Sequence, residues 1–193
     1  MIDMHKLLLF ACLLGFSLPS LSAQGRFFTK KGTITFDADG PMIDIEKIHA
    51  TSAGASCVVD AASGQMEWAV PIKSFKFKNA LMEEHFNENY LESEKYPKAT
   101  FKGSIANPEQ VKWTEDGNYP VKVTGKMTLH GVTRDVQANG NILVKDKEIR
   151  ASSKIEIALA DYKIKIPSVV GLKIAQSAQV AISATLEPLT SNQ

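Results

Sequence analysis

The sequence is poor in cysteine and carries almost no net charge. Its 193 residues include two cysteines, Cys12 and Cys57, which excludes a disulfide scaffold and every metal site built from several cysteines. Lysine and arginine number 22 against 21 aspartate and glutamate residues, for a formal charge of +1. A nucleic-acid-binding protein would need a surplus of basic residues, and so would electrostatic capture by an anionic membrane surface. We therefore expect no nucleic-acid partner.

Long apolar runs are absent outside the N-terminus. Residues 1–23 combine Lys6, an apolar run over 7–16 and small residues up to Ala23, which is typical of a secretory signal peptide. The run is too short to span a bilayer, which takes about 20 apolar residues. A lipoprotein signal ending at Cys12 is the alternative, although Cys12 lies inside the apolar run. Because no apolar stretch long enough for a transmembrane segment follows Ala23, we expect a soluble secreted protein.

Apolar and polar residues alternate with period two along the rest of the chain. This alternation predicts strands with one buried and one exposed face, as in antiparallel sheets. The chain shows no internal repeat and no linker, so residues 24–193 are expected to form a single domain. The clearest alternating segments are 33–37, 100–105, 121–130, 155–159 and 180–186.

Three predicted hairpin turns agree with the alternation of apolar and polar residues in the strands on either side of them. Hairpin tips at His130-Gly131, at Asp146-Lys147 and around Ala61–Gly64 would place apolar residues opposite each other on the inner face. The opposed pairs would be Leu129 with Val132, Val144 with Ile149, and Val59 with Met66.

One strand changes phase. Met66 and Ile72 share one parity, whereas Phe75 and Phe77 have the other, so we expect a β-bulge near Lys73-Ser74. Counting the alternating segments gives about eight strands in all. Such a sheet packs on a second sheet or closes into a barrel; we predict an all-β, eight-stranded antiparallel barrel with a short helical insert.

The helical insert is predicted over Asn79–Glu94. Asn79 is a suitable N-cap, and Pro97 lies beyond the end. The apolar residues of the segment are expected to face inward and cover one end of the barrel. They are Leu81, Met82, Phe86 and Tyr90.

The sequence contains few residues that indicate a catalytic or metal site. No pair among His49, His85 and His130 has the spacing of metal ligands, and His130 suits a hairpin turn because histidine tolerates positive φ. Cys57 shares the inward parity of Val59, which predicts a buried, inert thiol. The sequence has no nucleophile elbow, phosphate-binding loop or dinucleotide fingerprint. We expect no enzyme activity, no catalytic residue and no metal.

The predicted interior mixes large side chains with glycine. Gly103 and Gly125 take inward positions within strands, where glycine is costly and usually marks a bend, a bulge or a close approach. One interpretation is a filled barrel in which large and small residues pack against each other. The other is a cavity for an apolar ligand, since eight strands can leave room for one. In that case Gly103 and Gly125 would help to keep a tunnel open.

Several blocks of sequence resemble one known family. The blocks are Val70-Pro71-Ile72-Lys73-Ser74-Phe75-Lys76-Phe77, Leu81-Met82, His85-Phe86-Asn87, Tyr90-Leu91-Glu92-Ser93, Lys95-Tyr96-Pro97-Lys98-Ala99-Thr100-Phe101-Lys102-Gly103 and Leu129-His130-Gly131-Val132-Thr133. Over roughly Gly32 to Pro188 the chain resembles the YceI-like family of lipid- or polyisoprenoid-binding proteins. The resemblance implies a lipocalin-like barrel that holds a long isoprenoid chain, with the helical insert near its mouth and export to the periplasm.

The resemblance and the inner-face pattern together give a set of candidate ligand-binding residues. Many family members have an Arg-Asp pair before the helix histidine, whereas Glu83-Glu84 precede His85 here. Because carboxylates repel an anionic head group, a neutral isoprenoid or quinone is the expected ligand. His85 is either a surface residue or a contact to the ligand head group. The candidates are Phe36, Trp68, Phe75, Phe77, Leu81, Met82, His85, Phe86, Tyr90, Phe101, Gly103, Gly125 and Met127.

Two function classes remain at this point. The first is a periplasmic protein that binds, carries or sequesters an isoprenoid or similar lipid. The second is a secreted stress or interaction protein with a filled barrel, whose outer surface acts on a partner.

Overall fold

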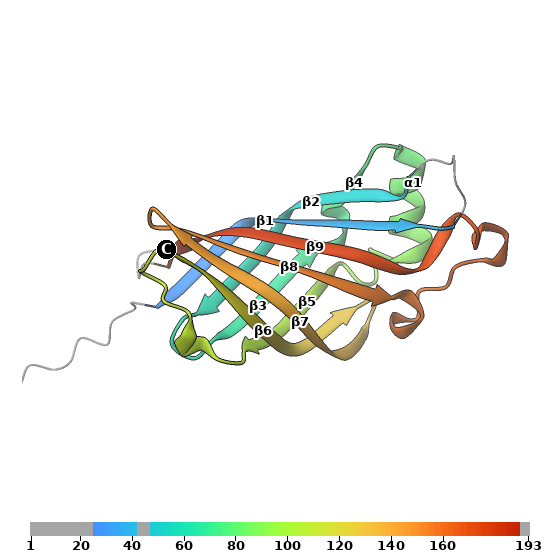
Figure 1. Ribbon diagram of the computed structural model, residues 1–193. Coiled ribbons are helices and arrows are strands. Elements are labelled where there is room, and N and C mark those ends of the chain that lie inside the picture. The colour runs from blue at the N-terminus through green and yellow to red at the C-terminus, as the bar shows by residue number, and fades with distance from the viewer. Residues whose placement is uncertain (1–24, 42–46, 190–193) are drawn as a thin grey trace, which may run out of the picture.

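Eight strands form a closed antiparallel barrel in the computed structural model, which describes residues 25–41 and 47–189 (Figure 1). These strands are β1 (Arg26–Asp39), β2 (His49–Asp60), β3 (Gln65–Pro71), β5 (Lys98–Ile105), β6 (Gly117–Leu129), β7 (Val132–Lys145), β8 (Glu148–Ala158) and β9 (Ile174–Pro188). They are ordered β1-β9-β8-β7-β6-β5-β3-β2, and β1 pairs with β2 to close the ring. The predicted fold class is confirmed. The expected signal peptide, Cys12 included, lies outside the described residues.

The alternation of side chains creates the barrel wall. In β6, half-buried and exposed residues alternate from Gly117 to Met127, because successive side chains of a strand point to opposite faces. The exposed face carries lysines such as Lys122 and Lys126, and the inner face carries Val121 and Val123.

The three predicted hairpins are present. Leu129 lies opposite Val132, Val144 opposite Ile149, and Val59 opposite Met66. Both two-residue tips have positive φ at each position, as a type I′ turn requires. The φ values are 49° and 72° at His130 and Gly131, and 51° and 68° at Asp146 and Lys147.

The predicted bulge near Lys73-Ser74 is wrong. The strand ends at Pro71, and a 3₁₀ turn, η1 (Ile72–Ser74), leads into a two-residue strand, β4 (Lys76–Phe77), which pairs with the start of β2. The Ser74 hydroxyl donates to the Pro71 carbonyl. The Oγ of the fully buried Ser52 lies 2.6 Å from the Ser74 Oγ. The 3₁₀ turn shifts the inward-facing positions by one residue, as a bulge would. The alternation of apolar residues therefore does not distinguish a turn from a bulge.

The helical insert is shorter than expected and has two parts. An α-helix, α1 (Ala80–His85), continues into a π-helical turn, η2 (Phe86–Tyr90), in which the Leu91 N–H donates to the Phe86 carbonyl. The Asn79 side chain accepts from the N–H groups of the first turn, which confirms the predicted N-cap. We call residues 80–90 the helical cap; it lies over one end of the barrel (Figure 1).

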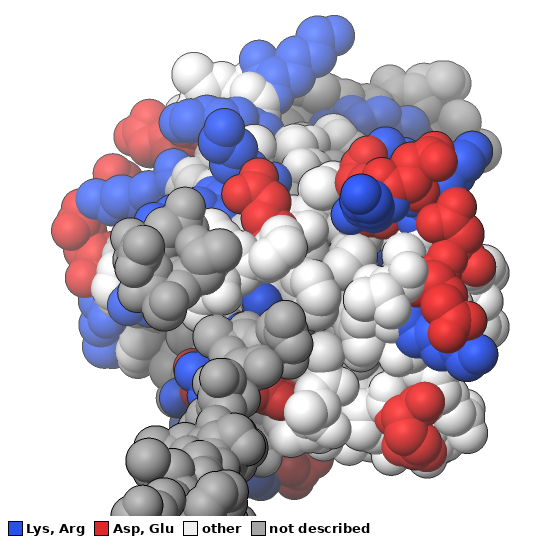
Figure 2. Space-filling model, turned by 90° about the vertical axis from the view of Figure 1, so that its left-hand side faces the viewer, with Lys and Arg blue, Asp and Glu red and all other residues white. Residues whose placement is uncertain are grey.

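The two ends of the barrel differ in packing. At the end away from the cap, Ile142, Val144 and Leu186 form a buried cluster, and Trp113 stacks on Phe27 at 5.1 Å between ring centroids. Figure 2 shows this end, where charged groups of both signs surround its uncharged surface. These side chains pack together at that end, and Ile142 and Leu186 also line the space inside the barrel.

Short turns complete the described chain. They are η3 (Pro108–Gln110), η4 (Leu159–Tyr162) and η5 (Ser168–Val170). Between η4 and β9 the chain crosses the cap end of the barrel, where Tyr162 and Ile164 are buried against Ile72 and Leu91.

Candidate functional site

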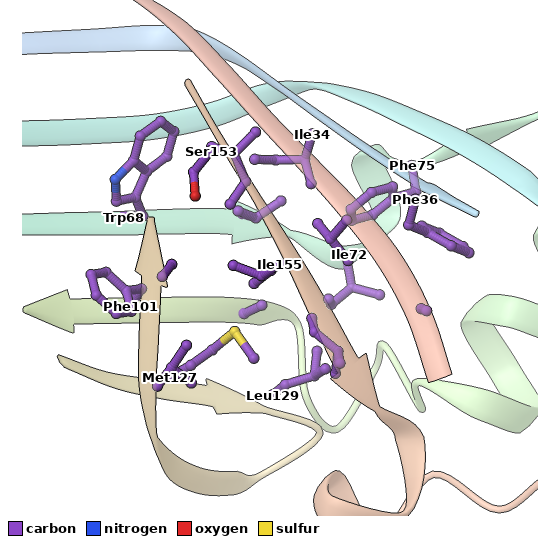
Figure 3. Close-up of a pocket in the computed structure, with 18 of the residues that line it drawn as sticks. Ile34, Phe36, Trp68, Ile72, Phe75, Phe101, Met127, Leu129, Ser153 and Ile155 are labelled. Atoms are coloured by element: carbon purple, nitrogen blue, oxygen red, sulfur yellow. The ribbon is translucent and has the colours of Figure 1, made fainter. Parts of the chain in front are cut away.

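A large apolar cavity occupies the barrel interior. Its volume is about 590 Å³, and its lining comes from the inner faces of the strands and from the helical cap. Figure 3 shows the side chains converging on this space, with Trp68 and Phe101 toward one end and Phe36 and Phe75 toward the other. A volume of this size is typical of small-molecule sites, so the barrel is not filled.

Most of the candidate residues lie on the cavity wall. Ten of the thirteen line it: Phe36, Trp68, Phe75, Phe77, Met82, His85, Phe86, Tyr90, Phe101 and Met127.

Leu81 does not line the cavity, contrary to prediction. Its side chain is 56% exposed, while its neighbour Met82 is on the cavity wall. Because α1 has only six residues before the π-helical turn, it presents a narrow inward face, and Leu81 falls outside it.

Gly103 and Gly125 do not keep the tunnel open. They lie directly opposite each other on β5 and β6, and neither is on the cavity wall. A Cβ on Gly125 would come within 2.4 Å of the Lys102 carbonyl oxygen and 2.7 Å of Cζ of Phe101. The space above the glycines is therefore taken by the neighbouring backbone and by the Phe101 ring. The glycines allow close strand approach and seat this ring.

Four phenylalanines form the roof of the cavity. Phe86 of the cap lies 5.4 Å from Phe36, 5.5 Å from Phe75 and 5.1 Å from Phe77, measured between ring centroids. Rings at these separations attract each other beyond the gain from burial alone. The cluster therefore attaches the cap to the barrel at this end of the cavity, which we call the mouth.

An ion pair fixes the outer side of the cap. The Lys76 ammonium on β4 donates to Glu83, which also accepts the N–H of Phe77. The hydrogen bond from Lys76 lowers the pKa of the Glu83 carboxyl. One of the two adjacent carboxylates at Glu83-Glu84 is thus balanced by a cation, which reduces the negative charge expected at the mouth.

His130 connects the barrel wall to the segment that follows the cap. One ring nitrogen lies 2.7 Å from a Glu92 carboxylate oxygen and the other 2.9 Å from the Tyr162 carbonyl oxygen. The ring also packs on the edge of Tyr96, with centroids 4.8 Å apart. Its place in the turn was predicted, but these partners were not, because they come from distant parts of the sequence.

Polar groups are few along the cavity wall. Ser153 lines it (Figure 3), but its hydroxyl already donates to the Asn139 carbonyl at 2.8 Å. Burial raises the pKa of the Cys57 thiol to about 12, so the thiol is neutral and inert, as predicted. His85 and Lys173 lie at the mouth and are exposed. The wall can thus bind a hydrocarbon chain, while the mouth offers polar groups.

Further wall residues were not among the candidates. Aliphatic side chains that share the inward parity of their strands, among them Ile34, Ile155 and Val180, could have been found from the alternation. Ile164, Ile166 and Val170 line the cavity from the segment before β9, whose residues show neither a strand nor a helix pattern.

In the described ranges no group of histidine, cysteine, aspartate and glutamate side chains could hold a metal ion. No helix in the same ranges is long and apolar enough to cross a bilayer.

A closed antiparallel barrel with an apolar cavity under a helical cap defines a class of small-molecule-binding barrels. The chain belongs to the YceI-like domain family, whose family model matches residues 13–186. The resemblance noted in the sequence is thereby confirmed. No curated protein matches the chain.

Solved structures share the fold at low sequence identity. A polyisoprenoid binding domain from Saccharophagus degradans, implicated in plant cell wall breakdown, is 14% identical with a TM-score of 0.73, over 86% of this chain and 99% of its own. BcnA of Burkholderia cenocepacia is 15% identical with a TM-score of 0.63, over 81% and 96%. The YCEI protein of Campylobacter jejuni is 19% identical with a TM-score of 0.53, over 75% and 88%.

Proposed function

We propose that this protein binds an isoprenoid or a similar long apolar chain inside its barrel, and carries or sequesters it. The observation that carries the proposal is the cavity of about 590 Å³ with its almost wholly apolar wall. Filling such a wall with hydrocarbon removes apolar surface from water, which stabilises the complex by about 25 cal/mol per Å². Membership of the YceI-like family and the fold shared with a polyisoprenoid binding domain support the same ligand class.

The cavity volume sets the length of chain that can be enclosed. A cavity of about 590 Å³ lies within the range typical of small-molecule sites, so it can enclose a short isoprenoid chain or part of a longer one. A longer chain would extend through the mouth beneath the helical cap.

The mouth suits a neutral head group, such as a quinone or an alcohol. Glu84 and Glu88 are exposed on the helical cap, and the exposed Lys173 lines the cavity from the segment before β9. An anion would meet carboxylates on the cap and a cation would meet the ammonium of Lys173, so neither gains a clear advantage.

We propose a binding protein rather than an enzyme, acting in the periplasm. The Cys57 thiol is held neutral and the Ser153 hydroxyl donates to a backbone carbonyl, so neither is an activated nucleophile. Export depends on residues 1–23, which have the composition of a signal peptide. The alternative of a filled barrel acting through its surface is disfavoured by the cavity.

The proposal is tested by extracting the purified protein with organic solvent and identifying the bound lipid by mass spectrometry. Ala138 lines the cavity on β7, so Ala138→Phe should occupy ligand space and reduce the bound lipid. Gln137→Phe adds the same ring to the exposed face of the same strand and serves as the matched control. A barrel that carries no lipid, or Ala138→Phe with the same load as Gln137→Phe, would contradict the proposal.

A further inference from the structure

Exposed large apolar side chains are concentrated at the mouth of the barrel. In the described part of the chain they are Val58, Leu81, Val169 and Leu172. Val169 is 87% exposed and Leu172 is 65% exposed. Both lie in the segment 163–173, which we call the rim loop, and Leu81 lies on the cap at the same end of the barrel (Figure 1). Such clustering marks a surface that meets an apolar partner.

The rim loop presents one set of side chains to the cavity and another to solvent. Ile166, Val170 and Lys173 line the cavity, while Val169 and Leu172, next to them in sequence, point outward. The loop is held in place by backbone hydrogen bonds from Lys173 N–H to the Val170 carbonyl, 2.8 Å, and from Gly40 N–H to the Lys173 carbonyl, 2.9 Å. The exposed apolar groups are thus fixed beside the route into the barrel.

The charges of the rim loop are complementary to an anionic lipid surface. Lys163, Lys165 and Lys173 are exposed, and none of the three forms an ion pair within the ranges that the structure describes. Lysines flanking apolar side chains can lie along a bilayer surface with their ammonium groups among the head groups. The exposed carboxylates Glu84 and Glu88 are on the cap, so the loop side should face the membrane.

We propose that the rim loop docks the barrel mouth on a phospholipid bilayer, with Val169 and Leu172 inserted between the lipid head groups. The proposal rests on the proposed function, because a chain that leaves a membrane for the cavity then avoids water. Insertion of the apolar side chains supplies most of the attraction. The lysines add a contribution that depends on anionic lipid and is screened by salt. The balanced charge of the whole chain excludes strong electrostatic capture but is compatible with this contact.

Co-sedimentation with vesicles tests the docking surface. Wild-type protein is compared with Val169→Asp/Leu172→Asp on vesicles of phosphatidylcholine and on vesicles of equal parts phosphatidylcholine and phosphatidylglycerol. Val58→Asp is the matched control, because Val58 is an exposed apolar residue on the barrel wall. We expect the partition coefficient of the double variant to fall about tenfold or more on both vesicles. Val58→Asp should bind as the wild type does.

The lysines are tested separately. Lys163→Gln/Lys165→Gln should weaken binding to the vesicles that contain phosphatidylglycerol and leave binding to pure phosphatidylcholine unchanged. Equal loss on both vesicle types would contradict the assigned role of the charges.

Three results would overturn the proposal: no vesicle binding by the wild type, equal binding by the double variant, or equal loss with Val58→Asp. A wild type that dimerises where the double variant stays monomeric, with no vesicle binding, would assign the loop to a second copy. Lipid loading from detergent solution, without vesicles, is measured in parallel. Normal loading together with failed vesicle binding would reject the docking surface alone, whereas absent loading would reject the proposed function.

Discussion

Gly125→Ala tests why glycine lies at the centre of the barrel wall. An added Cβ would lie 2.4 Å from the Lys102 carbonyl oxygen, 2.5 Å from the Gly103 Cα and 2.7 Å from Cζ of Phe101. Two of these obstacles are backbone atoms of the neighbouring strand, which can move only if the strands separate. Overpacking of this kind costs about 1–3 kcal/mol.

The effect of the substitution on the unfolded chain partly offsets this destabilisation. Replacing glycine by alanine stabilises a protein by about 0.4–1 kcal/mol when the native site accepts the methyl group, because the unfolded chain loses freedom. At the middle of these two ranges, the net destabilisation is about 1.3 kcal/mol. In a domain of this size, that lowers the melting temperature by roughly 3–5 °C.

The sign of the change distinguishes the two interpretations of the glycine. If Gly125 faced open tunnel space, the alanine variant would be neutral or more stable. Urea unfolding of lipid-free protein measures the difference, since bound lipid would itself raise the apparent stability. Gly54→Ala is the control, because its Cβ would meet only ordinary contacts, the nearest being the Ser74 Cβ at 3.4 Å. A Gly125→Ala protein as stable as Gly54→Ala would refute the close-approach explanation.

Three further predictions concern the thiol and the helical cap. Cys57, with a pKa of about 12, should resist iodoacetamide at pH 8 until urea unfolds the protein; rapid labelling of the native protein would contradict its burial. Phe86→Ala should lower the free energy of unfolding by about 2–3 kcal/mol and speed amide hydrogen exchange in the cap, because it removes the central ring of the four-phenylalanine cluster. If the cap amides are as protected from exchange as the strand amides, with or without lipid, the cap does not open. The pKa of the Glu83 carboxyl is lowered in the folded state. The ion pair with Lys76 therefore stabilises the folded protein at pH values above the ordinary glutamate pKa, and this stabilisation is lost as the pH falls through the folded-state pKa. Amide hydrogen exchange in the helical cap should therefore speed up in acid, and Glu83→Gln should remove this pH dependence. If the variant keeps the same pH dependence, groups other than Glu83 cause it.

The barrel and its hairpins could be predicted from sequence because the signals are local. Alternation along β6 defines which residues face inward, and the opposition of Leu129 and Val132 across the His130-Gly131 turn fixes the register. The same parity places Phe36 and Met127 on the cavity wall. Each of these inferences needs only neighbouring residues.

Other features depend on contacts between distant segments. The inward parity of Gly103 and Gly125 is correct, but only the structure shows that backbone and the Phe101 ring fill the space above them. The phase change before Phe75 fits a 3₁₀ turn as well as a bulge. The rim loop has no periodic pattern that would reveal its place at the mouth, although several of its side chains line the cavity.

Photoaffinity labelling tests most directly whether an apolar chain lies inside the barrel. The protein is loaded with an isoprenoid alcohol that carries a diazirine near its apolar end. After irradiation, mass spectrometry of the peptides locates the crosslinks. We predict adducts on wall residues such as Trp68, Phe101 and Met127, and their loss in Ala138→Phe but not in Gln137→Phe. Adducts confined to exposed residues of the outer face, or the same pattern in both variants, would contradict binding within the barrel.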